Sequence, residues 1–213
     1  LSEPLLILGA RRFALEVADI VSEIEGYQLT GFVENTDPER CREPLEGLPV
    51  HWVDDLASMA KTHWAVCAFG STTRRGFIEQ AAAMGIRFAT LIHPAARFSR
   101  KSSAGPGTVI WPGVNVSAYT TIGAHVLVNR GALIGHHTEL GDGITVGPGA
   151  NIAGACTIGA GCCIGMGSVI VDSMRIGAGA VVAAGAVVTR EIPPNVMVAG
   201  SPAVVVKHGV DGY

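Results

Sequence analysis

Two adjacent histidines, His136 and His137, are candidates for acid–base chemistry. An imidazole titrates near neutrality, so a positioned histidine can take a proton from an attacking amine or hydroxyl group. The pair fills the third and fourth places of the six-residue stretch Ile134-Gly135-His136-His137-Thr138-Glu139. Two solvated or interface-packing histidines would fit this spacing equally well. The spacing alone therefore leaves their role open.

The histidines lie inside a repeat with a period of six residues. Seventeen hexads run from Ile92 to Val188 without an insertion, and the first residue of each is a large apolar one except at Ala104. Glycine commonly follows this first residue, and the fifth place is mostly small or β-branched. An amphipathic helix would instead repeat its apolar residues at three and four. A fixed short period is typical of a solenoid, so we expect short parallel strands around a continuous core.

The repeat resembles that of the bacterial hexapeptide-repeat transferase superfamily. This resemblance implies a left-handed parallel β-helix with three hexads in each coil, a homotrimer, and active sites between neighbouring helices. The stretch from Asn129 to His137 is similar to the catalytic segment of bacillosamine, perosamine and sialic-acid acetyltransferases. That similarity implies that His136 is the base and that Asn129 belongs to the site. Relatives usually have Asp or Glu where this chain has His137.

Because of that departure, the partner that orients the His136 imidazole stays open, with Glu139 and Asp142, of the same or a neighbouring subunit, as candidates. The segment Asn151-Ile152-Ala153-Gly154 resembles the one whose glycine amide points at the thioester carbonyl of acetyl-CoA. A rigidly held backbone N–H suits a developing oxyanion. A plain corner glycine is the alternative for Gly154.

The end of the chain resembles the closing segment of the same family. The stretch Ile192-Pro193-Pro194-Asn195-Val196-Met197-Val198-Ala199-Gly200-Ser201-Pro202-Ala203 matches its pattern of proline, valine and GxPA. In relatives this segment ends the last coil beside the CoA nucleotide, which implies that Gly200, Pro202 and Ala203 contact CoA. Lys207 follows where an ammonium group could meet a CoA phosphate, although a solvated lysine fits as well.

Residues 1–91 have a different pattern, in which short apolar runs alternate with helical spacing. Strands are expected at 5–8, 29–33, 64–69 and 87–92, the last of which would lead into the repeat. Helical spacing runs from Phe13 to Ile24 with Gly26 as the stop, and a second helix around Phe77 would be capped by Ser71. We therefore predict a Rossmann-like α/β substrate-binding domain over 1–91 and a β-helix that binds acetyl-CoA and carries catalysis over 92–213.

Ligand-binding turns are expected at the ends of the first strands. Most relatives have a glycine-rich turn with a histidine after the first strand, whereas this chain has Gly9-Ala10-Arg11-Arg12-Phe13-Ala14. Side chains there oppose a close backbone approach, but Arg11 or Arg12 could bind a phosphate through the guanidinium group. Glu34 stands where relatives carry acidic residues for a nucleobase or ribose, and Gly70 begins a third candidate turn. A full dinucleotide fingerprint is missing, which argues against an NAD-dependent activity.

Composition excludes several other classes. A net charge of −3 and a pI near 6.2 give no basic surface for nucleic acid. No apolar stretch reaches the length of a membrane span, and a cytoplasmic location is expected because Arg11 and Arg12 follow the first apolar run instead of preceding it. Five cysteines without a CxxC pair argue against a disulfide framework. No metal is expected, since adjacent histidines in an extended strand would point to opposite sides and His125 alone is a poor third ligand.

These observations together predict an acetyl-CoA-dependent N-acetyltransferase that acts on an amino group of a nucleotide-linked sugar by direct transfer. The same base and helix would serve an O-acetyltransferase acting on sialic acid or a related sugar. A non-catalytic sugar-binding β-helix module is a third possibility, which the altered turn at Gly9 and the missing acidic neighbour of His136 favour.

Overall fold

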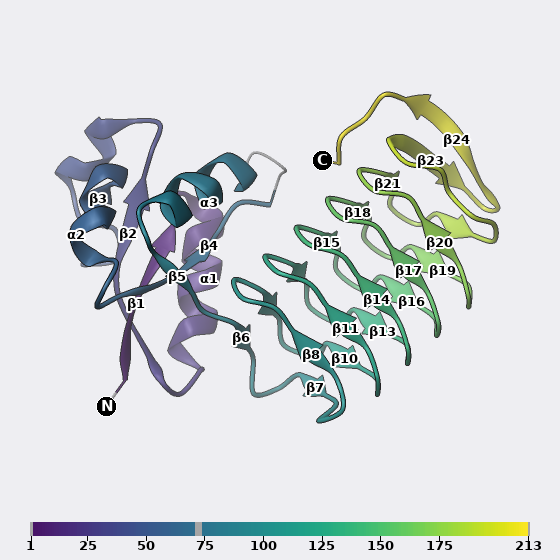
Figure 1. Cartoon of the computed structure of the whole chain (residues 1–213), viewed down its shortest axis with the longest axis horizontal. Coiled ribbons are helices and arrows are strands. Elements are labelled where there is room, and N and C mark those ends of the chain that lie inside the picture. The colour runs from purple at the N-terminus through teal and green to yellow at the C-terminus, as the bar shows by residue number, and fades with distance from the viewer. Residues whose placement is uncertain (1, 71–73, 213) are drawn as a thin grey trace. The chain divides into compact units, whose positions relative to one another are not determined.

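The chain folds into two compact units, Leu1–Leu91 and Ile92–Tyr213. The computed structural model describes residues 2–70 and 74–212. The first unit is a parallel sheet with helices, and the second is a stack of short parallel strands in three sheets (Figure 1). The expected fold class, a Rossmann-like α/β domain followed by a parallel β-helix, is confirmed. Among the described residues, no helix is long and apolar enough to cross a membrane.

The first unit is built on a five-stranded sheet in the order β3-β2-β1-β4-β5, with all neighbouring strands parallel. Its strands are β1 (Glu3–Leu8), β2 (Tyr27–Glu34), β3 (Val50–Trp52), β4 (Trp64–Cys67) and β5 (Arg87–Phe88). Its helices are α1 (Arg12–Ser22), α2 (Leu56–Met59) and α3 (Arg74–Ala83), with short 3-10 helices η1 (Pro38–Arg42) and η2 (Val53–Asp55). A parallel sheet covered on both faces needs strands that are apolar throughout, as 5–8 are.

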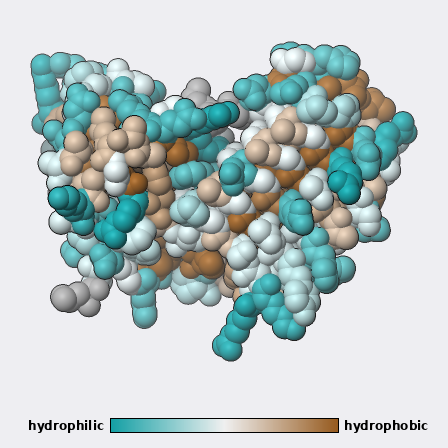
Figure 2. All heavy atoms as spheres, in the orientation of Figure 1, coloured by the Kyte–Doolittle hydropathy of each residue, from teal (hydrophilic) through white to brown (hydrophobic). Residues whose placement is uncertain are grey.

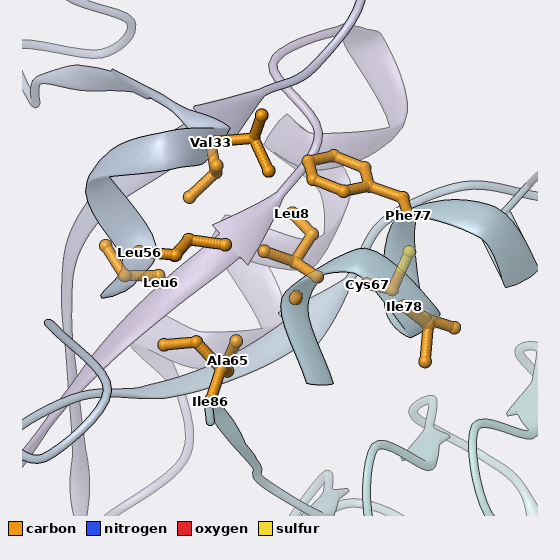
Figure 3. Packing of buried hydrophobic residues seen from close by; sticks show 11 residues of the cluster. Leu6, Leu8, Val33, Leu56, Ala65, Cys67, Phe77, Ile78 and Ile86 are labelled. Atoms are coloured by element: carbon orange, nitrogen blue, oxygen red, sulfur yellow. The ribbon is translucent and has the colours of Figure 1, made fainter. Parts of the chain in front are cut away.

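The core of this unit packs helix side chains against the sheet (Figure 3). Phe77 and Ile78 of α3 and Leu56 of α2 lie with Leu6 and Leu8 of β1 in one buried cluster. The predicted cap, Ser71, lies outside the described residues. The short elements β3 and α2 were not predicted, and the single strand expected over 87–92 is wrong. Those residues form two strands, β5 in the α/β sheet and β6 (Leu91–Ile92) in the β-helix, because the hydrogen-bonded partner changes between them.

The second unit repeats every 18 residues. Val116 pairs with Ile134 and Ile134 with Ile152, so three hexads make one coil and residues 18 apart stack on one another. The two-residue strands are β7 (Arg97–Phe98), β8 (Ser103–Ala104), β9 (Val109–Ile110), β10 (Asn115–Val116), β11 (Thr121–Ile122), β12 (Leu127–Val128), β13 (Leu133–Ile134), β14 (Glu139–Leu140), β15 (Thr145–Val146), β16 (Asn151–Ile152), β17 (Thr157–Ile158), β18 (Cys163–Ile164), β19 (Val169–Ile170), β20 (Arg175–Ile176), β21 (Val181–Val182) and β22 (Val187–Val188). The antiparallel strands β23 (Val196–Gly200) and β24 (Ala203–His208) complete one sheet.

The first residue of a hexad and the fifth fill the interior of the β-helix. Ile134 and Ile152 are 1% exposed, and Ala132 and Ala150 are fully buried. Thr138 is also fully buried, and its hydroxyl donates to the carbonyl of Ala153 in the next coil at 3.1 Å. Burying a hydroxyl without such a partner would cost free energy. The repeat thus supplies both the apolar core and the few polar groups inside it.

The coils turn at corners through residues with positive φ. One column of corners turns on glycines such as Gly131 and Gly149. Another has side chains in the left-handed region: Tyr119, His137, Ala155 and Ser173, with φ of 62°, 56°, 57° and 63°. We call these four stacked positions the non-glycine corner. The left-handed region costs an L-residue about 1–2 kcal/mol, so this corner displays side chains at the expense of backbone strain.

Candidate active site

His136 and His137 lie together at the non-glycine corner, between β13 and β14. Their Nδ1 atoms are 3.0 Å apart, and the rings meet edge to face at 86° with centroids 5.2 Å apart. The prediction that adjacent histidines would point to opposite sides is wrong, because His137 is not in an extended strand. Its left-handed backbone turns the chain and brings the two rings onto one side.

Gly154 lies one coil further along, where its backbone faces the His136 ring. A methyl group built on Gly154 would come within 2.8 Å of His136 Cε1 and 2.9 Å of Nε2. The Gly154 carbonyl accepts a hydrogen bond from the Ser173 amide at 2.9 Å, whereas its own N–H has no acceptor among the described residues. An unpaired amide beside an exposed imidazole nitrogen is the combination that a base and an oxyanion donor require.

The candidates for orienting His136 are engaged elsewhere or lie apart from it. Asp142 Oδ1 accepts from the Ala124 amide at 2.7 Å and so holds a corner of the preceding coil. Glu139 is exposed on β14, and no described contact joins it to His136. His137 is therefore the side chain that meets His136 Nδ1 within one chain.

Asn129 lies at a different corner from His136, directly after β12. Its side-chain Nδ2 donates to the carbonyl of Val146 at 2.9 Å, and its backbone N–H donates to the same oxygen. The structure therefore shows Asn129 bridging two coils, and it does not bring this residue to His136 within one chain.

Sequence reasoning missed Tyr119 and Lys101, which belong to the surroundings of His137. The Tyr119 ring lies 4.9 Å from the His137 ring with a tilt of 34°. Lys101 Nζ donates to the Tyr119 hydroxyl at 2.9 Å and lies 5.0 Å from the ring centroid. The signal that would have found them is the spacing of 18 residues, because 101, 119 and 137 differ by one coil each.

The predicted CoA-binding residues at the end of the chain gather on one hairpin. Gly200 ends β23 with φ of 97°, Pro202 is exposed in the turn, and Ala203 is buried at the start of β24. Lys207 is exposed on β24 and pairs through its backbone with Met197. The grouping of these residues agrees with a shared role, and their contact with CoA stays a prediction.

In the first unit, the predicted ligand turns lie at the carboxyl ends of β1, β2 and β4. Gly9 follows β1 with φ of 122°, and a side chain there would press on Phe69 at 3.0 Å. Arg11 immediately precedes α1, and its Nη2 donates to Thr36 Oγ1 after β2 at 3.4 Å. Arg12 at the start of α1 and Gly70 after β4 are both exposed. Open α/β sheets bind ligands at this edge of the strands.

Glu34 is the most buried charged residue of that edge, with 1% of its surface exposed. Its Oε1 accepts from the amides of Asn35 and Thr36 at 2.9 and 2.8 Å, and from the Thr36 hydroxyl at 2.7 Å. Burial alone would raise the pKa of this carboxyl, but these hydrogen bonds and the nearby Arg11 lower it below its ordinary value. Arg40 Nε lies 3.9 Å from Oε2. One oxygen of Glu34 therefore holds the turn, and the other meets only a loose ion pair.

Known proteins share the hexapeptide repeat and the fold of this chain. Residues 137–172 match the family model of the bacterial transferase hexapeptide (six repeats). Perosamine N-acetyltransferase from Caulobacter crescentus, solved with CoA and GDP-perosamine, is 27% identical with a TM-score of 0.87, covering 96% of this chain and 97% of its own. The acetyltransferase domain of PglB from Neisseria gonorrhoeae, solved with acetyl coenzyme A, is 29% identical with a TM-score of 0.88, covering 96% of this chain and 100% of its own. The chain is a hexapeptide-repeat acetyltransferase.

A third solved structure similar to this acetyltransferase is WeeI from Acinetobacter baumannii, at 25% identity and a TM-score of 0.85 over 96% of this chain and 100% of its own. No match was found among curated protein sequences. All three structures span both units, so the likeness extends well beyond the repeat that the family model covers.

The three buried cysteines of the acetyltransferase are poorly suited to covalent catalysis. Burial raises the pKa of Cys67 to about 12 and that of Cys162 to about 11, and it also raises the pKa of Cys156. A thiol that stays protonated is a weak nucleophile. Within 2–70 and 74–212, no group of three His, Cys, Asp or Glu side chains is arranged to hold a metal ion.

Proposed function

We propose that this acetyltransferase takes the acetyl group from acetyl-CoA and transfers it to the amino group of a nucleotide-linked sugar. The observation that carries the proposal is the placement of His136 Nε2 beside the backbone of Gly154, whose N–H has no acceptor among the described residues. The printed ligands of the similar enzymes, CoA with GDP-perosamine and acetyl coenzyme A, support the choice of donor and of acceptor class.

The reaction would proceed by direct attack in a ternary complex. The amine nitrogen of the sugar attacks the thioester carbonyl carbon, and His136 Nε2 takes the proton that the amine loses. The N–H of Gly154 donates to the oxygen as it becomes negative. The C–S bond then breaks, and the proton on His136 passes to the leaving thiolate, which gives CoA and the N-acetyl sugar. The raised pKa values of the buried cysteines agree with a path without an acyl-enzyme.

The first unit would bind the nucleotide. Arg11 and Arg12 lie at the beginning of α1, where a guanidinium group and the positive end of the helix both favour a phosphate. The partly unsatisfied Oε2 of Glu34 could accept from a ribose hydroxyl or a base amine, and Gly70 leaves open space at the end of β4. Gly9 would let the chain turn closely at this edge.

The second unit would bind CoA and assemble as a homotrimer. Gly200, Pro202, Ala203 and Lys207 form the candidate CoA surface at the final hairpin, with the Lys207 ammonium toward a phosphate. Hydrophobic surface runs along part of the stacked strands (Figure 2), and Leu133 and Val169 in one sheet are 44% and 38% exposed. Burial of such surface between copies would stabilise an oligomer. A site between copies would also explain how Asn129, at another corner, contributes to catalysis.

The test is CoA release from acetyl-CoA with UDP-, GDP- and dTDP-linked amino sugars and with free sialic acid. We expect turnover on an amino sugar, a fall of about 10²–10⁴-fold in His136→Ala, and unchanged turnover in the control His63→Ala. Activity on sialic acid alone would move the assignment to O-acetylation. Binding of acetyl-CoA with no turnover on any acceptor would refute the proposal and favour a binding module.

A further inference from the structure

We propose that His137 is a positioning residue that fixes the tautomer of His136. This inference rests on the proposed function, in which His136 is the base. The 3.0 Å distance joins the Nδ1 atoms of the two rings. Two neutral imidazoles can share a hydrogen bond there only if one carries its proton on Nδ1 and the other on Nε2. The contact therefore constrains both tautomers at once.

The useful arrangement has His136 as the donor. With the proton on Nδ1, its Nε2 keeps a lone pair, and Nε2 is the nitrogen that faces Gly154. In the reverse arrangement, Nε2 of His136 would carry a proton and could not accept one from the substrate. Solvent can accept the Nε2 proton of His137, because this side chain is exposed.

The surroundings of His137 hold its ring in place beside His136. Tyr119 packs on the His137 ring, and the Lys101 ammonium is bonded to Tyr119. A ring held in this way keeps its Nδ1 at hydrogen-bonding distance from Nδ1 of His136. With Nδ1 of His136 donating to His137, the proton taken from the substrate goes to Nε2 of His136.

His137 thus takes the place that an Asp or Glu side chain occupies in similar enzymes, without supplying a negative charge. It orients the base by accepting one hydrogen bond, and its ring is held by the Tyr119 contact and by the left-handed backbone at φ of 56°. A carboxylate at this position would accept the same hydrogen bond and also stabilise the imidazolium form of His136.

The substitution His137→Gly separates this role from folding. Glycine relieves the left-handed strain at residue 137, but its flexibility in the unfolded chain lowers stability. The lost contact with the Tyr119 ring lowers stability further. These effects nearly cancel, so the melting temperature stays close to that of the wild type. The matched control is Ser173→Gly, at the same corner two coils further on with φ of 63°.

We expect kcat to fall at least tenfold in His137→Gly with the KM for acetyl-CoA little changed, and Ser173→Gly to retain the wild-type kcat. His137→Asp should restore much of the kcat, since it returns an acceptor to the corner. Full kcat in His137→Gly, or an equal loss in Ser173→Gly, would overturn the proposal.

A second readout does not depend on turnover. Nitrogen-15 NMR of histidine-labelled protein, above the pH at which the pair is protonated, reports which ring nitrogen carries hydrogen. We expect His136 protonated on Nδ1 in the wild type and redistributed toward Nε2 in His137→Gly. An Nε2–H tautomer in the wild type, or no change in the variant, refutes the positioning role. Full activity in His136→Ala would refute the proposed function instead, so the two failures are distinguishable.

Discussion

The substitution Gly154→Ala tests whether the contact between glycine and imidazole is the catalytic one. The added methyl group would lie 2.8 Å from His136 Cε1, 2.9 Å from Nε2 and 3.2 Å from Nδ1. Carbon atoms pack at about 3.5–4.0 Å, so the ring must move by roughly 0.7–1 Å. The imidazole ring of His136 lies at the end of an exposed side chain, so the ring can move at little cost in folding free energy.

The substitution Gly154→Ala should therefore lower the rate of the reaction and leave the stability of the fold unchanged. A displacement of about 1 Å from the reactive geometry costs on the order of 10²-fold, which corresponds to about 2.7 kcal/mol in the activation free energy. Gly154 does not have a positive φ, so alanine fits its backbone. Alanine also lowers the conformational entropy of the unfolded chain, which stabilises the folded protein by about 0.4–1 kcal/mol. We expect kcat to fall about 10–100-fold while the melting temperature is unchanged or slightly higher.

The control is Gly159→Ala, which follows β17 at another corner. Its methyl group would meet the Ala178 backbone, with 2.5 Å to the nitrogen and 2.7 Å to Cα. Backbone in a stacked coil cannot move aside as a side chain does, so this variant should lose about 1–3 kcal/mol of stability. Assayed well below its melting temperature, it should keep its turnover.

The assay is initial-rate CoA release for both variants, paired with thermal unfolding followed by circular dichroism. The reasoning predicts opposite results, with activity lost at Gly154 and stability lost at Gly159. Gly154→Ala with wild-type kcat would show that the position of the His136 ring beside residue 154 does not matter to the reaction. A large fall in its melting temperature would show that the ring cannot move as supposed.

Three further outcomes follow from the structure. Because the pKa of Glu34 is lowered on folding, its ionised form stabilises the protein above the ordinary carboxyl range, and this contribution is lost as the pH falls. Glu34→Gln should lower the melting temperature near pH 7, and the melting temperature of the variant should then fall less than that of the wild type between pH 7 and about pH 4. Thermal unfolding scans of both proteins at the two pH values measure this. An equal fall in the wild type and the variant would contradict it. Iodoacetamide near neutral pH should modify only the half-buried Cys41 and Cys163 and leave turnover intact, while the urea-unfolded chain reacts at all five cysteines; mass spectrometry identifies the sites, and inactivation would count against direct transfer. Gly76→Ala in α3, where a methyl group meets nothing within 4 Å, should stabilise the first unit by ~1 kcal/mol, and an unchanged or lower melting temperature would contradict the open helical environment.

The β-helix could be predicted from the sequence because one physical constraint repeats in it. Every coil must bury its first residue on the one above, so Val116, Ile134 and Ile152 follow at a fixed interval and pair in the structure. The first unit has no such redundancy. Its three-residue strand β3 and four-residue helix α2 are too short to produce a recognisable period, and their formation depends on packing against the rest of the sheet.

The candidate residues at the active site were predicted, but their relations were not. The hexad pattern put His136 and His137 at the third and fourth places of a hexad without giving the backbone angles there. A negative φ at residue 137 would turn its ring away from His136. The observed φ of 56° instead brings Nδ1 of His137 to 3.0 Å from Nδ1 of His136. The same limit left Asp142 among the candidates for orienting His136, whereas within one chain its Oδ1 accepts from the amide of Ala124 in the preceding coil.

The period of 18 residues explains why the proposed base and the proposed oxyanion donor meet in this fold. Residues 18 apart stack on one another, so the residue that follows His136 in the next coil is Gly154, which has no side chain. The ring can keep its observed position only with glycine at 154, because even a methyl group would come within 2.8 Å of it. The missing side chain at 154 leaves the space that the imidazole occupies, and the Gly154 N–H has no acceptor among the described residues. One coil thus presents the proposed base and the next presents the proposed donor, at a separation fixed by strand pairing and not by a flexible loop.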